Sequence, residues 1–80
     1  MKITFITGAA NGLGKEFAVL YGKDGNNLLL VDIDKEALSS VKNELSMLYP
    51  NIFIDTFIAD LAKEEELKKV FAYTLEKGYF

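Results

Sequence analysis

Three glycines within seven residues form the part of this sequence best suited to hold an anionic ligand. Gly8, Gly12 and Gly14 follow an apolar run and precede a helical pattern. A loop between the end of a strand and the start of a helix gathers unpaired backbone N–H groups at the positive end of the helix dipole. Glycine also lets the backbone approach a ligand closely, because it has no Cβ. The pattern favours a phosphate-binding loop, with an ordinary strand-to-helix turn as the alternative. Its Gly-x-x-x-Gly-x-Gly spacing differs from the common G-x-G-x-x-G.

Two aspartates follow later apolar runs and are further candidates for ligand contacts. Asp32 lies 18 residues after Gly14, close to the offset of about 20 residues at which an acidic side chain accepts hydrogen bonds from the ribose hydroxyls of a dinucleotide. Asp60, which precedes Leu61, follows the next apolar run. Both have a structural alternative. Asp32 suits a turn, although Asp34 is better placed for that role, and Asp60 suits the start of a helix.

Strand patterns alternate with helix patterns along the chain. We expect strands at residues 3–7, 27–32 and 52–58. Residues 28–31 are apolar without alternation, which is typical of a parallel strand covered on both faces. Three helices are predicted from apolar stripes at helical spacing. The stripes are Leu13, Phe17, Leu20 and Tyr21; Leu38, Val41, Leu45 and Leu48; and Leu67, Val70, Phe71 and Leu75.

The residues at the helix ends agree with this alternation. Asp34 can cap the second helix, which stops before Pro50, and Gly78 can end the third. Strands that alternate with helices through right-handed crossovers predict an α/β fold. We expect a partial doubly wound sheet of three parallel strands in spatial order 3-2-1 with three helices. Residues 1–80 would then form a single domain or fragment.

The composition argues against several functions. The chain has 9 basic and 12 acidic residues, a net charge of −3 and no arginine, so we expect no nucleic acid as a partner. It has no cysteine and no histidine, which removes disulfides and the usual zinc ligands, and we expect no metal site. No apolar run approaches the roughly 20 residues that a membrane span needs. We expect a cytoplasmic protein that does not enter the membrane.

Together these residues resemble the short-chain dehydrogenase/reductase family. The resemblance rests on the loop at residues 7–14, Gly25 before the second strand, Asp32 at its end, and Asp60-Leu61, and it extends over essentially all 80 residues. It implies a Rossmann-type fold that binds a dinucleotide. By the family pattern, Asp32 would bind the adenosine ribose, and Asp60 and Leu61 would meet the adenine. The phosphates and the nearby ribose would be lined by Gly8, Asn11, Gly12, Leu13 and Gly14.

Asp32 also bears on the choice of cofactor. A carboxylate at this position accepts hydrogen bonds from a 2′-hydroxyl and repels a 2′-phosphate. Ile33 follows it, where a phosphate-binding site would favour arginine or lysine. We therefore expect NAD(H) rather than NADP(H) and include Ile33 among the cofactor-binding residues.

The resemblance does not extend to the family's catalytic residues. Family members carry a catalytic serine and a Tyr-x-x-x-Lys pair in segments that follow the three strands seen here. Tyr73 and Lys77 have that spacing, but they fall at the end of the third helix, where a lysine suits the helix dipole. We assign no catalytic residue and expect the NAD(H)-binding N-terminal portion of an oxidoreductase, inactive on its own. The alternative is a complete small module that binds a nucleotide or self-associates without catalysis.

The strand at residues 3–7 is expected to form an open edge of the sheet. Unpaired backbone groups on such an edge invite another strand, and an uncovered apolar face favours association. Ala9, Phe57 and Tyr79 are candidates for that face. We therefore expect a homo-oligomer that forms through the exposed sheet edge or face.

Overall fold

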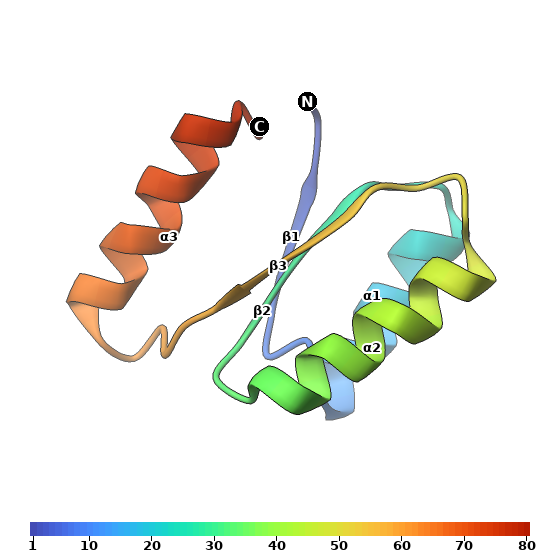
Figure 1. The fold of residues 1–80 in the computed structure, drawn as a ribbon, viewed down its shortest axis with the longest axis horizontal. Helices are drawn as coiled ribbons and strands as arrows, with labels where there is room; N and C mark the ends of the chain where they lie inside the picture. Colours follow the sequence, from blue (N-terminus) through green and yellow to red (C-terminus); the bar gives the residue numbers. More distant parts are fainter.

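The computed structural model describes residues 1–80 as three strands and three helices in alternation (Figure 1). The elements are β1 (Thr4–Thr7), α1 (Gly12–Lys23), β2 (Leu28–Asp32), α2 (Lys35–Leu48), β3 (Ile54–Ile58) and α3 (Glu64–Lys77). All strand pairs are parallel and the order is β1-β2-β3. In the register, Leu30 lies between Ile6 and Thr56. The predicted α/β fold and strand order are confirmed.

The third strand starts later than the sequence pattern indicated, at Ile54 rather than residue 52. A side chain and one backbone hydrogen bond together hold the residue that precedes this strand. The Asn27 side-chain oxygen accepts the N–H of Phe53 at 2.9 Å, while the Phe53 carbonyl accepts the N–H of Leu28 at 2.9 Å. Asn27 therefore aligns the first residues of β2 and β3, which is a tertiary contact that the apolar pattern does not reveal.

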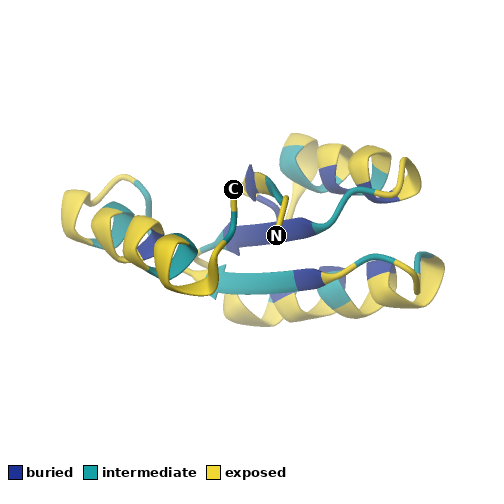
Figure 2. Ribbon diagram, turned by 90° about the horizontal axis from the view of Figure 1, so that it is seen from above, coloured by how far each residue is buried: buried dark blue, intermediate teal, exposed yellow.

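The four apolar residues 28–31 of β2 are buried because helices cover both faces of the strand. α1 and α2 lie on one side of the sheet and α3 on the other (Figure 1), and the central strand is dark blue in Figure 2. Side chains alternate between the two faces. Toward α1 and α2 the core holds Ile6, Ala9, Ala10, Ala18, Leu28, Leu30, Leu38, Val41, Leu45 and Ile54. Toward α3 it holds Leu29, Val31, Ala59 and Val70.

The helix ends follow from local chemistry. The Asp34 carboxylate accepts the N–H of Ala37 at 3.0 Å and caps α2, as predicted. Gly78 takes the left-handed conformation, with φ 72°, and ends α3. The residue that precedes α3 is Lys63 rather than Asp60, so Asp60 does not cap this helix. None of the helices is both long and apolar enough to cross a membrane.

All three predicted apolar stripes include side chains that are exposed in the structure. In α1, the large residues Leu13, Phe17, Leu20 and Tyr21 are exposed, and the buried residues are Ala18 and Gly22. α1 lies so close to the sheet that only small side chains fit beneath it. In α3, Val70 is buried, but Phe71 is exposed and Leu75 is 81% exposed. Leu48 at the end of α2 is exposed as well. The exposed apolar faces of α1 and α3 flank the outer edge of β1.

Phe80 pairs with the residues just before β1. The N–H of Phe80 donates to the Met1 carbonyl at 3.0 Å, and the N–H of Ile3 donates to the Phe80 carbonyl at 2.8 Å. This is the hydrogen-bond pattern of a parallel bridge, and the two termini lie side by side (Figure 1). The rest of the outer edge of β1 stays open. Ala9 is fully buried, so the expectation that it adds to an exposed face is wrong.

Candidate functional site

The glycines of the loop between β1 and α1 are each required by the backbone. Gly8 and Gly12 have φ values of 58° and 56°, in the left-handed region that side chains disfavour. Gly14 is needed for a different reason. A Cβ at this residue would lie 2.7 Å from the carbonyl oxygen of Thr7 and closer still to that of Gly8. The first turn of α1 therefore packs directly against the end of β1.

The start of α1 presents backbone donors that the chain itself leaves unused. Asn11 precedes the helix in an extended conformation and makes no side-chain cap. No oxygen of the chain accepts the N–H groups of Gly12, Leu13 and Gly14. The first turn also contains no acidic residue. These donors, at the positive end of the helix dipole, suit a phosphate or another anion.

Asp32 connects the end of β2 to this loop. One carboxylate oxygen accepts the N–H of Ala10 at 3.0 Å, and the other accepts the N–H of Asp34 at 3.1 Å. The N–H of Ala9 also donates to the Val31 carbonyl at 3.2 Å. Each carboxylate oxygen retains a lone pair for a further donor. Asp32 thus fixes the loop and can still accept ligand hydroxyls. Its bond to the Asp34 N–H is the turn role that the sequence left open, whereas no sequence pattern indicated its bond to Ala10.

A small cleft of about 240 Å³ lies beside Asp32, at the end of β3. It is bounded by apolar side chains and by the Asp60 loop, which is joined to β2 because the N–H of Ala59 donates to the Asp32 carbonyl at 3.0 Å. Leu61 does not line this cleft and packs against the core under α3. The lining residues are Ile33, Ile58, Ala59, Asp60, Lys63 and Glu66.

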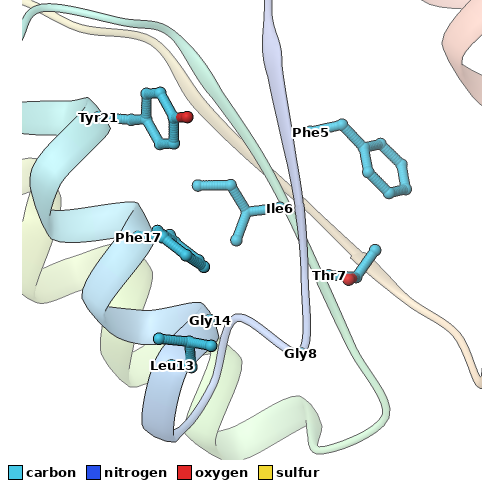
Figure 3. A pocket seen from close by; sticks show the side chains of 8 residues that line it. All are labelled: Phe5, Ile6, Thr7, Gly8, Leu13, Gly14, Phe17 and Tyr21. Carbon is cyan, nitrogen blue, oxygen red and sulfur yellow. The ribbon is translucent and has the colours of Figure 1, made fainter.

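A larger apolar pocket of about 440 Å³ lies on the other side of the loop, between α1 and the outer edge of β1 (Figure 3). Figure 3 shows that the Ile6, Phe17 and Tyr21 side chains enclose the space between strand and helix. Sequence reasoning missed this pocket because it treated the apolar face of α1 as core. The lining residues are Phe5, Ile6, Thr7, Gly8, Leu13, Gly14, Phe17 and Tyr21.

The Tyr73 and Lys77 pair has the wrong surroundings for proton transfer. The Tyr73 hydroxyl donates to Asp55 at 2.5 Å, and the Tyr79 hydroxyl donates to the same oxygen at 2.6 Å. The bond to the Asp55 carboxylate, together with burial, raises the pKa of Tyr73 to about 12. Lys77 lies over the Tyr73 ring, 5.6 Å from its centroid. A catalytic phenol needs a lowered pKa, so this arrangement favours a structural role.

These features define the class of protein. The chain belongs to the short-chain dehydrogenase family, because the family model described as short chain dehydrogenase matches residues 2–78. It is 39% identical over 61 residues to a very-long-chain 3-oxoacyl-CoA reductase of Vanderwaltozyma polyspora, covering 76% of this chain and 17% of that protein. It is 36% identical over 75 residues to 11-beta-hydroxysteroid dehydrogenase B of Sesamum indicum, covering 92% of this chain and 20% of that protein.

Solved structures of the family share the fold. An alcohol dehydrogenase from the archaeon Thermococcus sibiricus, complexed with 5-hydroxy-NADP, matches with a TM-score of 0.87 and 27% identity, covering 96% of this chain and 32% of that one. A short-chain dehydrogenase from Sphingobium yanoikuyae in complex with NADPH matches with a TM-score of 0.78 and 29% identity, covering 86% and 26%. The chain thus spans less than a third of the length of these relatives.

Proposed function

We propose that this chain is the NAD(H)-binding N-terminal portion of a short-chain dehydrogenase-type oxidoreductase. The observation that carries the proposal is the set of three unpaired N–H groups at Gly12, Leu13 and Gly14, beside a glycine loop fixed to Asp32. The loop, with Gly8 and Asn11, would hold the phosphates. When bound, the dinucleotide would supply hydride transfer. The residues described here bind and orient it, and none of them is assigned to catalysis.

The adenosine end has two neighbouring contacts in this proposal. Asp32 would accept the ribose hydroxyls with the lone pairs that Ala10 and Asp34 leave free. The adenine would enter the cleft of about 240 Å³, where Ile33 and Ile58 offer apolar surface and Asp60 a carboxylate. Leu61 would support the loop that carries Asp60 rather than touch the base.

NAD(H) is favoured over NADP(H) because Asp32 brings a negative charge to the position of a 2′-phosphate. The two solved relatives were determined with NADP-type ligands. The preference of this chain for NAD(H) therefore has to be tested on the chain itself. Titration of the chain with NADH and with NADPH should show tighter binding of NADH. Asp32→Ala should weaken NADH binding by roughly tenfold or more, because each hydrogen bond to a charged group is worth roughly 1.5–3 kcal/mol.

Two further variants make this experiment specific. Asp32→Asn keeps an oxygen acceptor and removes the charge, so it should tighten NADPH binding relative to NADH. Asp24→Ala removes an aspartate whose side chain accepts no hydrogen bond and should change neither affinity. Equal affinities of the unmodified chain for the two dinucleotides would refute the assignment of Asp32.

We also propose that the open edge of β1 associates with a second copy of the chain. Phe80 occupies this edge only beside residues 1–3, and the outward backbone groups of Phe5 and Thr7 remain beyond it. An apolar groove of about 220 Å³ adjoins the edge on the α3 side, and Phe5 lines both it and the larger pocket on the α1 side. A twofold pair of β1 edges would cover these surfaces in both copies at once.

Sedimentation equilibrium at micromolar concentration tests this association. The unmodified chain should sediment as a dimer, and Phe5→Glu should give the monomer mass of 8.9 kDa, because a charge on the edge opposes strand pairing. Met47→Glu is a matched control on α2, where the side chain is 84% exposed and distant from β1, and it should remain dimeric. A monomeric unmodified chain that unfolds cooperatively would exclude the dimer.

A further inference from the structure

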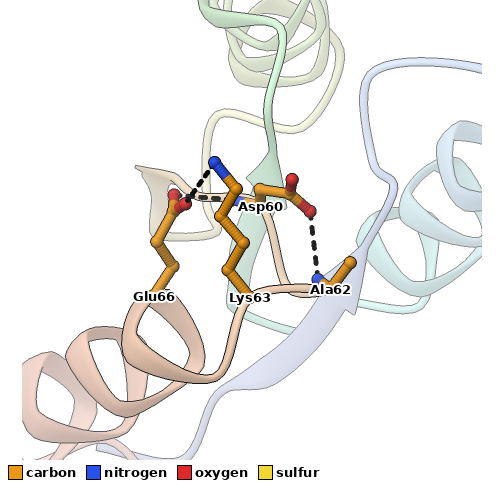
Figure 4. Close-up of polar contacts among 4 residues, drawn as sticks. All are labelled: Asp60, Ala62, Lys63 and Glu66. Atoms are coloured by element: carbon orange, nitrogen blue, oxygen red, sulfur yellow. Dashed lines mark hydrogen bonds and ion pairs between the residues drawn. The ribbon is translucent and has the colours of Figure 1, made fainter.

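Glu66 reaches from the first turn of α3 back to the loop that carries Asp60. Its Oε1 accepts the backbone N–H of Asp60 at 2.9 Å, and its Oε2 lies 3.9 Å from the Nζ of Lys63 (Figure 4). Glu64 and Glu65 occupy the same turn, but neither makes a hydrogen bond to this loop. Glu66 is therefore the one glutamate of the three that fixes the entry to the helix.

The Asp60 loop is held at two points and leaves one carboxylate oxygen free. Asp60 Oδ1 accepts the N–H of Ala62 at 3.0 Å, and the Asp60 backbone is held by Glu66. No group of the chain donates to Oδ2, and Figure 4 shows the carboxylate turned away from Glu66. Asp60, Lys63 and Glu66 all line the cleft of about 240 Å³. A fixed acceptor thus stands at a cleft that is lined by three apolar and three charged side chains.

We propose that Glu66 is a positioning residue for recognition of the adenine ring, and this inference rests on the proposed function. By accepting the Asp60 N–H, it holds the Asp60 carboxylate so that Oδ2 can accept a hydrogen bond from the exocyclic amine of adenine. A bond to an ionised acceptor is stronger than a neutral one. Because the loop is already ordered before the ligand binds, less conformational entropy is lost on binding. The ion pair with Lys63 is exposed and contributes little.

The test compares two ligands that differ only at the exocyclic group of the base. NADH carries an amine there, and reduced nicotinamide purine dinucleotide carries a hydrogen atom, which leaves N1 an acceptor and removes the donor to Asp60. The unmodified chain should prefer NADH. Glu66→Ala should weaken NADH binding about five- to tenfold, the effect of one hydrogen bond, and should change the affinity for the purine analogue by less than about twofold.

Two variants separate positioning from general stability. Glu66→Gln keeps a carbonyl acceptor for the Asp60 N–H and should restore NADH binding to within about twofold of the unmodified chain. Glu65→Ala removes an equal charge from the same turn and should leave both affinities unchanged. Equal weakening of the two ligands by Glu66→Ala, or no change in NADH binding, would overturn the role of Glu66. Failure of the unmodified chain to bind NADH would instead refute the proposed function, and this inference with it.

Discussion

Gly14→Ala should abolish measurable NADH binding and destabilise the fold. The new Cβ would lie 2.7 Å from the Thr7 carbonyl oxygen and closer to that of Gly8, and both are backbone atoms that cannot rotate away. α1 would have to move off the end of β1, which separates the three free N–H groups of its first turn from the loop. We expect a loss of about 3 kcal/mol in the free energy of unfolding, measured by urea denaturation.

Gly22→Ala is the matched control for this prediction. It lies in the same helix and receives the same substitution, but its new Cβ would meet the Tyr49 ring at 3.1 Å, and that side chain can shift. Alanine also gains about 1 kcal/mol of helix propensity over glycine, which offsets the contact. We expect Gly22→Ala to change the stability by no more than about 1 kcal/mol and to keep NADH binding. A Gly14→Ala chain that binds NADH normally would contradict the proposed loop.

Asp55→Ala should destabilise the packing of α3 on the sheet. Asp55 on β3 accepts hydrogen bonds from Tyr73 at 2.5 Å and from Tyr79 at 2.6 Å. The Tyr73 ring also packs against Phe57, with 4.9 Å between ring centroids. Removing the carboxylate leaves two phenols without their acceptor. A bond to a charged group is worth about 1.5–3 kcal/mol, less where water replaces it, so we expect a loss of about 2–4 kcal/mol in urea denaturation.

The same cluster predicts how stability depends on pH. Burial raises the pKa of Asp55, but the bonds from Tyr73, Tyr79 and the Thr56 N–H, with the charge of Lys42, together outweigh it and hold this pKa below 3.8. Its contribution is therefore present above pH 3.8 and is lost as the pH falls below that value. The pKa of Tyr73 is raised from 10.0 to about 12, first by its bond to Asp55, and that of Tyr79 is raised as well. The phenol contribution is complete below pH 10 and is lost as the pH rises toward 12.

Asp55→Asn should reduce both limbs of the pH profile. It removes the carboxyl that titrates in the acid limb, and it removes the charge that helps to raise the pKa values of Tyr73 and Tyr79. Asp24→Asn, which removes a charge without an attached hydrogen bond, should leave the profile of the unmodified chain. The measurement is the urea midpoint between pH 3 and pH 12. Identical profiles for Asp55→Asn and the unmodified chain would show that the Asp55 cluster does not govern this dependence.

The order of elements was predictable because the local patterns agree with the tertiary fold. Residues 28–31 form an uninterrupted apolar run, and in the structure both faces of β2 are covered. The buried face of α1 was not predictable from the same kind of pattern. Periodicity identifies large apolar residues such as Phe17 and Leu20, whereas close contact with the sheet selects Ala18 and Gly22. Spacing alone does not distinguish a core face from a face that borders an open edge.

The candidate site divides in a similar way. The glycine spacing and the position of Asp32 predicted a loop and an acidic residue at one edge of the sheet, and the structure brings them together. The bond from Ala10 to Asp32, the contact of Glu66 with Asp60, and the Asp55 cluster join residues from different elements. No local pattern marks such contacts. The Tyr-x-x-x-Lys spacing shows that a local pattern can also occur without its usual function. The Tyr73 hydroxyl of this motif donates to the Asp55 carboxylate, which raises the pKa of Tyr73.

In our proposal, the loop between β1 and α1 binds NAD(H) through the backbone of its glycines. The most direct measurement follows the backbone amide signals of the chain by nuclear magnetic resonance during titration with NADH. We expect saturable shifts of Gly12, Leu13 and Gly14, with further shifts at Asp32 and Asp60, and smaller shifts with NADPH at the same concentration. No saturable shift at Gly12, Leu13 and Gly14, or shifts confined to the face of α3, would contradict it.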